Sequence, residues 1–386
     1  MVFIISLGAV AAVIYTPALP MIQHQFGLDS ATVQLTVSIF MLGYAFGQLL
    51  YGPLANRYGR KITLYGALMI GVLGSVMCIA AGEIKYFELL IAGRLVMALG
   101  TGAGLTMGFM LINDVYQAQE ARRVVAHTTL AFAILPALAI FIGGFLVKHV
   151  NWQSCFYFIV VYCLALMAVT YYLPETLLVE QRRALNVATI VQGYMSVCRS
   201  SALWLYAAMW GIATLITYVF AGTAPIICIS LLHVSPDQFG SFNLIAAAGY
   251  ILGLLLSGRV AQTLSVTQVI SLGWLLTLIA SVLFLYFTEV HQLTIWTFYF
   301  AAFILFIGIP LIFSNSSAVA TQAVADKASG SAMMSFINMS LAVAGFFLMT
   351  YLPGAPELIM PEYFLVLVAI LGLLIVLSHH KKIKRL

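Results

Sequence analysis

One arginine lies within a long apolar segment, where a charged side chain needs a specific reason. Arg94 is about eight residues into the segment 86–112, a depth of about 12 Å at 1.5 Å per residue. An arginine inside a membrane span must face the protein interior and find hydrogen-bond acceptors. Because its planar guanidinium matches a carboxylate, the sequence predicts that Arg94 attracts an anionic substrate or group.

The acceptors available to Arg94 separate two interpretations. Tyr15, Gln34, Gln48, backbone carbonyls, water or a substrate anion could receive its hydrogen bonds. In the first interpretation the arginine binds substrate, and Arg94→Ala abolishes activity while the protein still folds. In the second, the arginine packs helices together and backbone carbonyls satisfy it. The sequence leaves both open.

The twelve acidic residues, unlike Arg94, all lie outside the middle of the apolar segments. Every one falls in a loop or within about a turn of the end of an apolar segment. Proton-coupled membrane proteins commonly use a buried carboxylate, and this chain shows none at mid-membrane. His127, near the start of the segment 123–146, is therefore the candidate proton carrier, since histidine titrates near neutral pH. Its alternative role is that of an interfacial polar residue.

Composition places these residues in a membrane protein. Of the 386 residues, 63% are hydrophobic and only 8% are charged, whereas soluble domains carry about 25% charged residues. The apolar runs are about 20 residues long and do not alternate, so we expect helices and not a barrel. The net charge of +5 is no indication of nucleic-acid binding.

The apolar runs predict an all-α protein of twelve spans in two six-helix halves. Residues 1–173 form the first bundle, 174–201 a cytoplasmic linker, and 202–386 the second bundle. Within the linker, 185–198 could form a short helix on the membrane surface. The expected spans are 2–22, 33–52, 62–82, 86–112, 123–146, 153–173, 202–221, 238–257, 266–288, 293–317, 328–351 and 362–379.

The distribution of lysine and arginine predicts the orientation of the chain. With both termini in the cytoplasm, fourteen of the seventeen cations lie on the cytoplasmic side, as the positive-inside rule requires. The first residues run directly into an apolar span without a basic leader, so we expect no signal peptide. The native chain could begin a few residues upstream.

A basic segment between the second and third spans gives the strongest motif. Residues 52–61, Gly-Pro-Leu-Ala-Asn-Arg-Tyr-Gly-Arg-Lys, combine turn-forming residues with three cations, which predicts a tight cytoplasmic hairpin. A degenerate counterpart, Leu254–Arg259, follows the eighth span. Such an echo at corresponding positions is typical of transporters built from two related halves, with the substrate site between them near mid-bilayer.

These motifs resemble the major facilitator superfamily, and most closely its twelve-span drug:proton antiporters of the Bcr/CflA type. The loop 52–61 matches the loop 2–3 motif, and Arg94–Gly102 matches the arginine motif of span 4. Further matches are Tyr15–Pro20, Asp114–Arg122, Pro136 with Gly143–Gly144, and Leu173–Thr176.

The chain departs from the family pattern at three positions. Asn56 stands where the loop motif usually has Asp, and Leu135 stands where the span 5 motif usually has Gly. Val13 occupies the place of an Asp that Bcr-like proteins tend to carry in span 1. The resemblance therefore implies the fold and the transporter class more strongly than it implies proton antiport.

The resemblance also implies a cytoplasmic gate. Cations of loop 2–3 would pair with the acid after span 4 and with exposed helix-end carbonyls, holding the inner side closed. Asn56 keeps hydrogen bonding but loses a charge, which predicts a weaker latch. The alternative for these cations is simple positive-inside anchoring. The predicted gating residues are Gly52, Asn56, Arg57, Gly59, Arg60, Lys61, Asp114 and Arg122.

Polar and aromatic residues within the spans are the candidates for substrate binding, because each would be costly facing lipid. Contact with substrate and packing between helices are both open for them. Their mixture of amides, hydroxyls and rings suits an amphipathic, neutral or anionic organic molecule. The candidates are Arg94, Tyr15, Gln34, Tyr44, Trp210, Tyr218, Asn243, Asn315 and Asn338.

The sequence therefore predicts a secondary active transporter of a small molecule in the bacterial inner membrane, with proton-linked efflux by alternating access. The alternatives are a siderophore or organic-anion transporter, importing or exporting, and a non-transporting membrane sensor. No nucleotide-binding motif, metal spacing or catalytic motif is present, so we expect no enzyme activity, metal or cofactor. The expected partners are substrate, protons and membrane lipid, without nucleic acid, and the expected state is a monomer.

Overall fold

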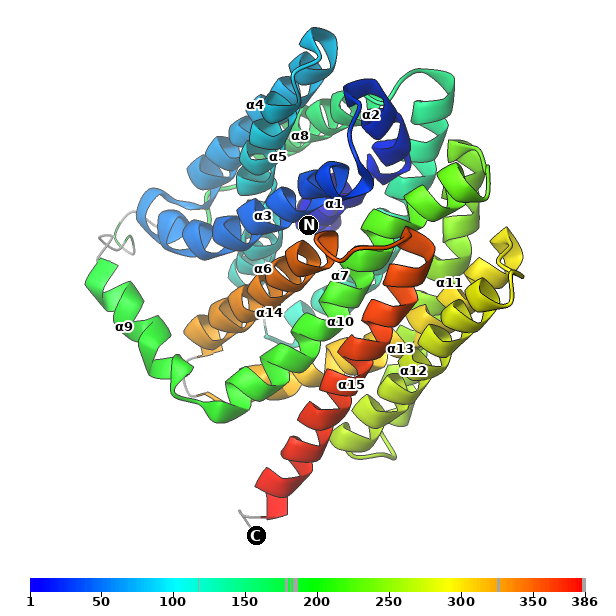
Figure 1. The fold of residues 1–386 in the computed structure, drawn as a ribbon. Coiled ribbons are helices and arrows are strands. Elements are labelled where there is room, and N and C mark those ends of the chain that lie inside the picture. The colour runs from blue at the N-terminus through cyan, green and yellow to red at the C-terminus, as the bar shows by residue number, and fades with distance from the viewer. Residues whose placement is uncertain (117, 178–179, 181, 183–186, 325–326, 384–386) are drawn as a thin grey trace. The chain divides into compact units, whose positions relative to one another are not determined.

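Helices make up nearly all of the described chain (Figure 1). The computed structural model describes residues 1–116, 118–177, 180, 182, 187–324 and 327–383. Within its helices, the side chains of residues 113, 118–133, 187, 189–190, 327–329 and 379–383 lie outside the description.

The chain forms two compact units, Met1–Gln192 and Gly193–Leu386. Their boundary lies within α9 (Val187–Cys198), a helix in the segment predicted as the linker. The helices of the first unit are α1 (Val2–Val13), η1 (Thr16–Ala18), α2 (Leu19–Phe26), α3 (Ser30–Tyr58), α4 (Arg60–Ile84), α5 (Phe87–Thr101), α6 (Ala103–Val115), α7 (Ala118–His149) and α8 (Ser154–Tyr172). Those of the second are α10 (Ser201–Pro225), η3 (Ile226–Leu231), α11 (Pro236–Val260), α12 (Val266–Glu289), α13 (Ile295–Gln322), α14 (Lys327–Thr350) and α15 (Pro356–Ile383).

The all-α membrane fold is confirmed. In the described part of the chain, eleven helical segments are long and apolar enough to cross a membrane. A shorter apolar segment, Ile134–His149, is the part of α7 whose side chains are described, and it corresponds to the fifth predicted span. Interruptions divide some predicted spans: the first comprises α1, η1 and α2, and the fourth comprises α5 and α6.

Short polar residues determine where several spans begin. The Asp29 carboxylate accepts a hydrogen bond of 2.8 Å from the Thr32 amide at the start of α3, and this contact with Thr32 lowers the pKa of Asp29. Ser235, Ser265 and Thr294 form capping boxes at the starts of α11, α12 and α13. A side-chain cap satisfies amides that the first helical turn leaves without partners.

The first span of each unit is interrupted at a proline. α1 ends at Val13, and Pro17 lies in the short η1 segment that follows. α10 ends at Pro225 and continues as the π-helix η3. Proline removes an amide and clashes with the preceding turn, so both breaks have the same cause.

The structure corrects the prediction of a tight hairpin loop over residues 52–61. α3 continues through Gly52 and Pro53 to Tyr58, and α4 begins at Arg60. Only Gly59 separates the two helices, with φ +97° and ψ 161°. Glycine reaches this backbone region because it has no Cβ. A single residue therefore makes the turn, whereas the sequence predicted a loop of ten residues.

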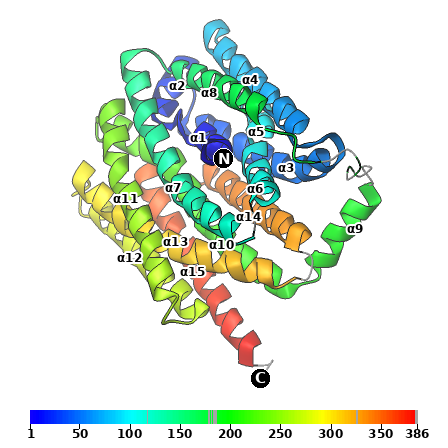
Figure 2. The same cartoon turned by 180° about the vertical axis from the view of Figure 1, so that it is seen from behind.

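Glycines also allow α4 and α5 of the first unit to pack closely. α4 packs along α5, and both views show α8 beside α4 (Figures 1 and 2). A Cβ added at Gly74 of α4 would overlap the backbone nitrogen of Met97 in α5. One added at Gly100 of α5 would overlap the backbone of Gly71. Small residues let membrane helices approach in this way and gain packing contacts.

We expect Gly74→Ala to separate α4 from α5 and to lower the free energy of unfolding by about 1–3 kcal/mol, the usual cost of overpacking. Gly66 is the matched control on the same helix, because a Cβ there meets nothing within 4 Å. Thermal denaturation of both variants in detergent measures the difference. Equal melting temperatures for Gly74→Ala and Gly66→Ala would contradict the close packing.

Candidate functional site

Arg94 is completely buried in the first unit, with 0% of its surface exposed. Its Nη1 and Nη2 atoms donate to the carbonyls of Ala11 and Ala12, at 3.0 and 3.4 Å. Its Nε donates to the carbonyl of Thr36 at 3.1 Å. The guanidinium therefore joins α5 to the end of α1 and to α3.

The break in the first span explains why these carbonyls are available. α1 ends at Val13, so the carbonyls of its last turn lack helical amide partners. Thr16 satisfies one of them, through a bond of 2.9 Å from its hydroxyl to the carbonyl of Val13. Arg94 supplies donors to two more, and its positive charge is favourable at the negative end of a helix.

Aromatic rings enclose the same guanidinium. The carbon at its centre lies 3.9 Å from the ring centroid of Tyr15 and 4.2 Å from that of Phe40. A desolvated cation–π contact contributes about 2 kcal/mol or more. The Tyr15 hydroxyl is hydrogen-bonded to that of Thr36 at 2.9 Å, and Tyr44 stacks on Phe40. Tyr15 is thus brought to Arg94, as predicted, while Gln34 lies buried on α3 without a described contact to the arginine.

These contacts match the second interpretation of Arg94, in which backbone carbonyls satisfy a packing arginine. The arginine stabilises an interruption in a membrane helix, a place where the protein must provide every donor. Nothing in the described geometry directs it at an anionic ligand.

The candidate residues of the second unit lie on four helices. Trp210 and Tyr218 are on α10, and Asn243 is on α11. Asn315 on α13 donates from Nδ2 to the Ser257 hydroxyl at 3.0 Å and to the Leu311 carbonyl at 2.8 Å, so it ties α13 to α11. Asn338 is buried on α14. The structure does not place these residues in a single described contact network.

The predicted gating residues meet at the junction of α3 and α4. Arg60 is buried and its Nε makes an ion pair of 3.0 Å with Asp114 of α6. Its Nη1 donates to the side-chain oxygen of Asn56 at 2.8 Å. Asn56 therefore supports the cation directly. Lys61 donates to the carbonyl of Tyr171 at 2.7 Å and lies over its ring.

Other gating predictions stay outside this cluster. Arg57 is exposed, and Gly52 is an ordinary residue inside α3. The side chains of Arg122 and of His127, the candidate proton carrier, lie outside the described residues.

Glu175 is a junction residue that the gating prediction did not include. Its carboxylate accepts hydrogen bonds from the backbone amides of Arg60 and Lys61, at 2.8 and 3.2 Å. An acid at the start of α4 is favoured by the positive end of the helix. Thr176, next in the chain, donates to Asp114 at 2.7 Å. The sequence could have indicated this role, because Glu175 is an acid just after the sixth predicted span, on the side where α4 begins.

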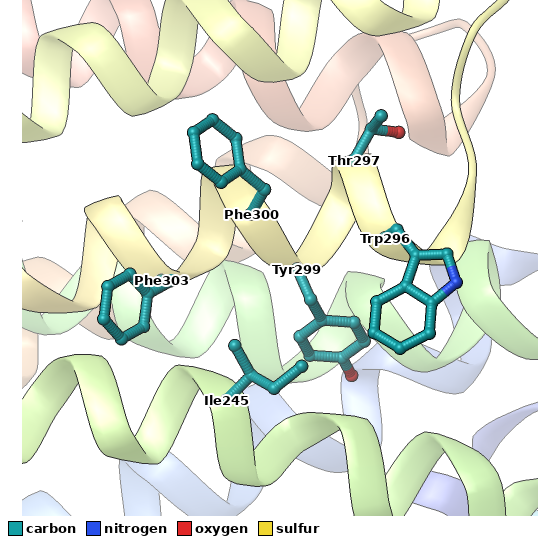
Figure 3. Close-up of a pocket in the computed structure, with 6 residues that line it drawn as sticks. All are labelled: Ile245, Trp296, Thr297, Tyr299, Phe300 and Phe303. Carbon is teal, nitrogen blue, oxygen red and sulfur yellow. The ribbon is translucent and has the colours of Figure 1, made fainter.

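An aromatic groove lies between α11 and α13 in the second unit, with a volume of about 590 Å³ (Figure 3). Its rings follow the spacing of one helix face, with Trp296, Tyr299, Phe300 and Phe303 on α13 and Ile245 facing them from α11. Trp296 is 67% exposed. The periodicity of these aromatics could have indicated the groove, but in an apolar span it is also typical of lipid-facing residues.

We expect Arg94→Ala to lower stability, at about 1–3 kcal/mol for each carbonyl left without a donor. This differs from the sequence-based expectation that the variant folds normally. Arg94→Lys, which keeps the charge but loses the planar fork, should recover part of the loss. Melting temperatures in detergent measure both. An unchanged melting temperature for Arg94→Ala would show that the carbonyl contacts contribute little.

We expect Gly59→Ala to destabilise the junction of α3 and α4 by about 1–3 kcal/mol, because only glycine adopts this backbone region without strain. An added Cβ would also lie 2.5 Å from Oε2 of Glu175. The control is Gly258→Ala, in the counterpart segment, where a Cβ meets nothing within 4 Å. Limited proteolysis and thermal denaturation compare the two; a Gly59→Ala protein as stable as Gly258→Ala would argue against a strained junction.

Comparison with solved structures shows the fold. The chain superposes on a D-xylose–proton symporter with a TM-score of 0.76, at 12% identity over 96% of each chain. A POT family transporter in complex with 5-aminolevulinic acid gives a TM-score of 0.73, at 14% identity, covering 98% of this chain and 94% of that one. At these identities the likeness concerns architecture alone.

Comparison of sequences identifies the family. An uncharacterized transporter of Rickettsia felis is 30% identical over 70% of this chain and 66% of its own length. A bicyclomycin resistance protein homolog of Haemophilus influenzae is 28% identical over 67% of this chain and 66% of its own. The chain thus spans just under two thirds of these relatives. The Major Facilitator Superfamily profile matches residues 1–231, and the chain belongs to that superfamily of membrane transporters.

Proposed function

We propose that this protein is a secondary transporter that exports a small neutral or anionic organic molecule from the bacterial cytoplasm in exchange for protons, by alternating access. The observation that carries the proposal is the junction of α3 and α4. There Arg60 pairs with Asp114, and Glu175 holds the start of α4, through contacts of 2.8–3.2 Å. Such contacts can be made and broken as a transporter changes conformation.

The names of relatives support the direction of transport. Relatives include a multidrug resistance protein D of Escherichia coli, 28% identical over 47% of this chain, and a chloramphenicol resistance protein of Pseudomonas aeruginosa, 26% identical over 72%. Resistance to a drug is a common consequence of its export. We place both termini in the cytoplasm and the protein in the inner membrane, on the basis of the lysine and arginine distribution.

The placement of charge supports His127 as the proton carrier in this proposal. The buried polar residues of the described chain include the arginines Arg60 and Arg94 but no carboxylate. A carboxylate-based proton site is therefore not seen among the described buried residues. The organic-anion alternative depended on Arg94, and the bonds of that side chain to backbone carbonyls no longer favour it.

Proteoliposomes with an acidic lumen test the proposal. We expect saturable uptake of radiolabelled chloramphenicol, because protons leaving the lumen drive the drug inward. A protonophore should abolish accumulation. Arg60→Ala should slow uptake by about tenfold, the effect of losing roughly 1.4 kcal/mol from one charge-assisted contact. His127→Gln should retain exchange of drug between the two sides while losing accumulation driven by the pH gradient.

Protein-free liposomes are the control, and chloramphenicol succinate is the anionic comparison. Uptake of neither compound above that of empty liposomes would contradict the proposed transport. Uptake that the protonophore leaves unchanged would contradict proton coupling but not transport, which would then be facilitated diffusion.

A further inference from the structure

Four buried polar atoms of the second unit have no hydrogen-bond partner among the described residues. They are Nε1 of Trp210, Oγ1 of Thr223, Oγ of Ser316 and Oδ1 of Asn338. Ser316 is 0% and Asn338 4% exposed. A buried polar atom without a partner costs about 1–3 kcal/mol, and most proteins avoid it. Four such atoms in one unit therefore need an explanation.

Three of these atoms, on Trp210, Ser316 and Asn338, lie on α10 and on the two helices that pack beside it. Thr223 lies apart from them, about 20 Å along α10 from Trp210. Trp210 of α10 contacts the ring of Phe313 of α13 edge to face, with centroids 5.2 Å apart. Ser316 follows Phe313 by one helical turn. On the other side, Gly211 of α10 faces α14 closely enough that a Cβ there would lie 3.2 Å from the Asn338 carbonyl oxygen. α10 thus contacts both neighbouring helices beside Trp210.

Each of the three side chains lies about 9–16 Å from one end of its helix. At 1.5 Å per residue, Trp210 is about 14 Å from the start of α10 and Asn338 about 16 Å from the start of α14. Ser316 is about 9 Å from the end of α13 by the same rise. The Ser200 hydroxyl, which caps α10, reaches the Ala323 carbonyl just beyond α13 at 3.5 Å. The start of α10 and the end of α13 therefore share one side of the unit.

The chemistry of these atoms is complementary to a neutral molecule. Trp210 offers a donor, Asn338 an acceptor, and Ser316 can be either. No charged side chain is among the buried residues of the second unit in the described chain, so an ionic ligand would lose its hydration without a counter-charge. The buried polar residues there are Thr223, Asn243, Ser257, Thr267, Thr277, Ser281, Asn315, Ser316, Asn338, Thr350 and Ser378.

Neighbouring polar residues show that this unit can satisfy its polar groups when they serve packing. Asn315, one residue before Ser316, makes two hydrogen bonds. Ser281, also 0% exposed, donates to the Thr277 carbonyl at 2.7 Å. The unpartnered atoms of Trp210, Ser316 and Asn338 therefore lie close in sequence or in space to polar groups that are satisfied, as expected for groups that pair with a ligand.

We infer that Trp210, Ser316 and Asn338 form a binding site within the second unit for an uncharged organic molecule that carries both a hydrogen-bond donor and an acceptor. The ring of Trp210 provides an apolar surface for the body of the ligand. This inference rests on the proposed transport function and narrows its substrate class from neutral or anionic to neutral.

Equilibrium binding to the purified protein tests the site without transport. The probe is thiamphenicol, a neutral aromatic amide with hydroxyl groups, compared with its cationic glycine ester and its anionic hemisuccinate ester. We expect saturable binding of the neutral compound and at least about tenfold weaker binding of both charged esters. Asn338→Leu and Ser316→Ala should each raise the Kd for thiamphenicol by about tenfold, the equivalent of roughly 1.4 kcal/mol.

The melting temperature of the ligand-free protein distinguishes binding from a structural role. Asn338→Leu removes an unpaired acceptor, so it should keep or raise the melting temperature while weakening binding. Trp210→Phe, which keeps the ring contact with Phe313, should weaken binding with little change in stability. The matched control, Ser281→Ala, should leave the Kd unchanged. A lowered melting temperature with an unaltered Kd would overturn the inference.

The two proposals fail separately. Binding of thiamphenicol that depends on these three residues, without uptake into proteoliposomes, would refute transport and keep the site. Uptake that is insensitive to Trp210→Phe, Ser316→Ala and Asn338→Leu would keep transport and refute the site. Equal or tighter binding of either charged ester would refute the neutral substrate class.

Discussion

A backbone carbonyl inside a membrane cannot bind water, so every interruption of a span requires a donor from the protein itself. The first span of this chain is interrupted after Val13, and the donors come from Arg94. One charged side chain, enclosed by the rings of Tyr15 and Phe40, thereby allows the polypeptide to change direction at depth. That single guanidinium joins α1, α3 and α5 at this point.

The start of α4 presents the reverse problem, because there the groups without helical partners are amides. Glu175 accepts two of them, as Arg94 donates to the carbonyls of α1. Glu175 lies in the segment after α8, 115 residues from Arg60 and 114 residues from Lys61 in the sequence. Its carboxylate therefore links two distant parts of the first unit. Neutralising opposite ends of helices with opposite charges is a common electrostatic principle, here applied at two places in one unit.

Composition and spacing were sufficient to predict the class of fold, since a chain with 8% charged residues must lie in lipid and lipid requires helices. The ion pair of Arg60 with Asp114 was among the pairings that the resemblance to the family's loop motif implied. The spacing could not predict that α3 extends to Tyr58, because glycine and proline are typical of turns and only tertiary contacts decide whether a helix continues through them. Nor could it choose between a ligand and backbone carbonyls as the acceptors of Arg94. That choice depends on where α1 ends, which is a property of three-dimensional packing.

The contribution of Glu175 was difficult to foresee for a related reason. The donors to its carboxylate are backbone amides, and backbone amides leave no signature in the residue types around them. The unpaired atoms of Trp210, Ser316 and Asn338 could not be predicted from the sequence either, because a polar residue type does not show whether its side chain has a hydrogen-bond partner. The structure distinguishes them from Asn315, whose side chain makes two hydrogen bonds.

The lack of charge among the described buried side chains of the second unit has an energetic consequence for the proposed exchange. A neutral cargo carries no charge across the bilayer, so each exchanged proton moves one net charge inward. The electrical potential then adds to the chemical gradient, by about 2.3 kcal/mol per charge for each 100 mV. A cell whose interior and exterior have equal pH could still power such an exporter from its membrane voltage, whereas one-for-one exchange of a proton for a monovalent cation would gain nothing from it.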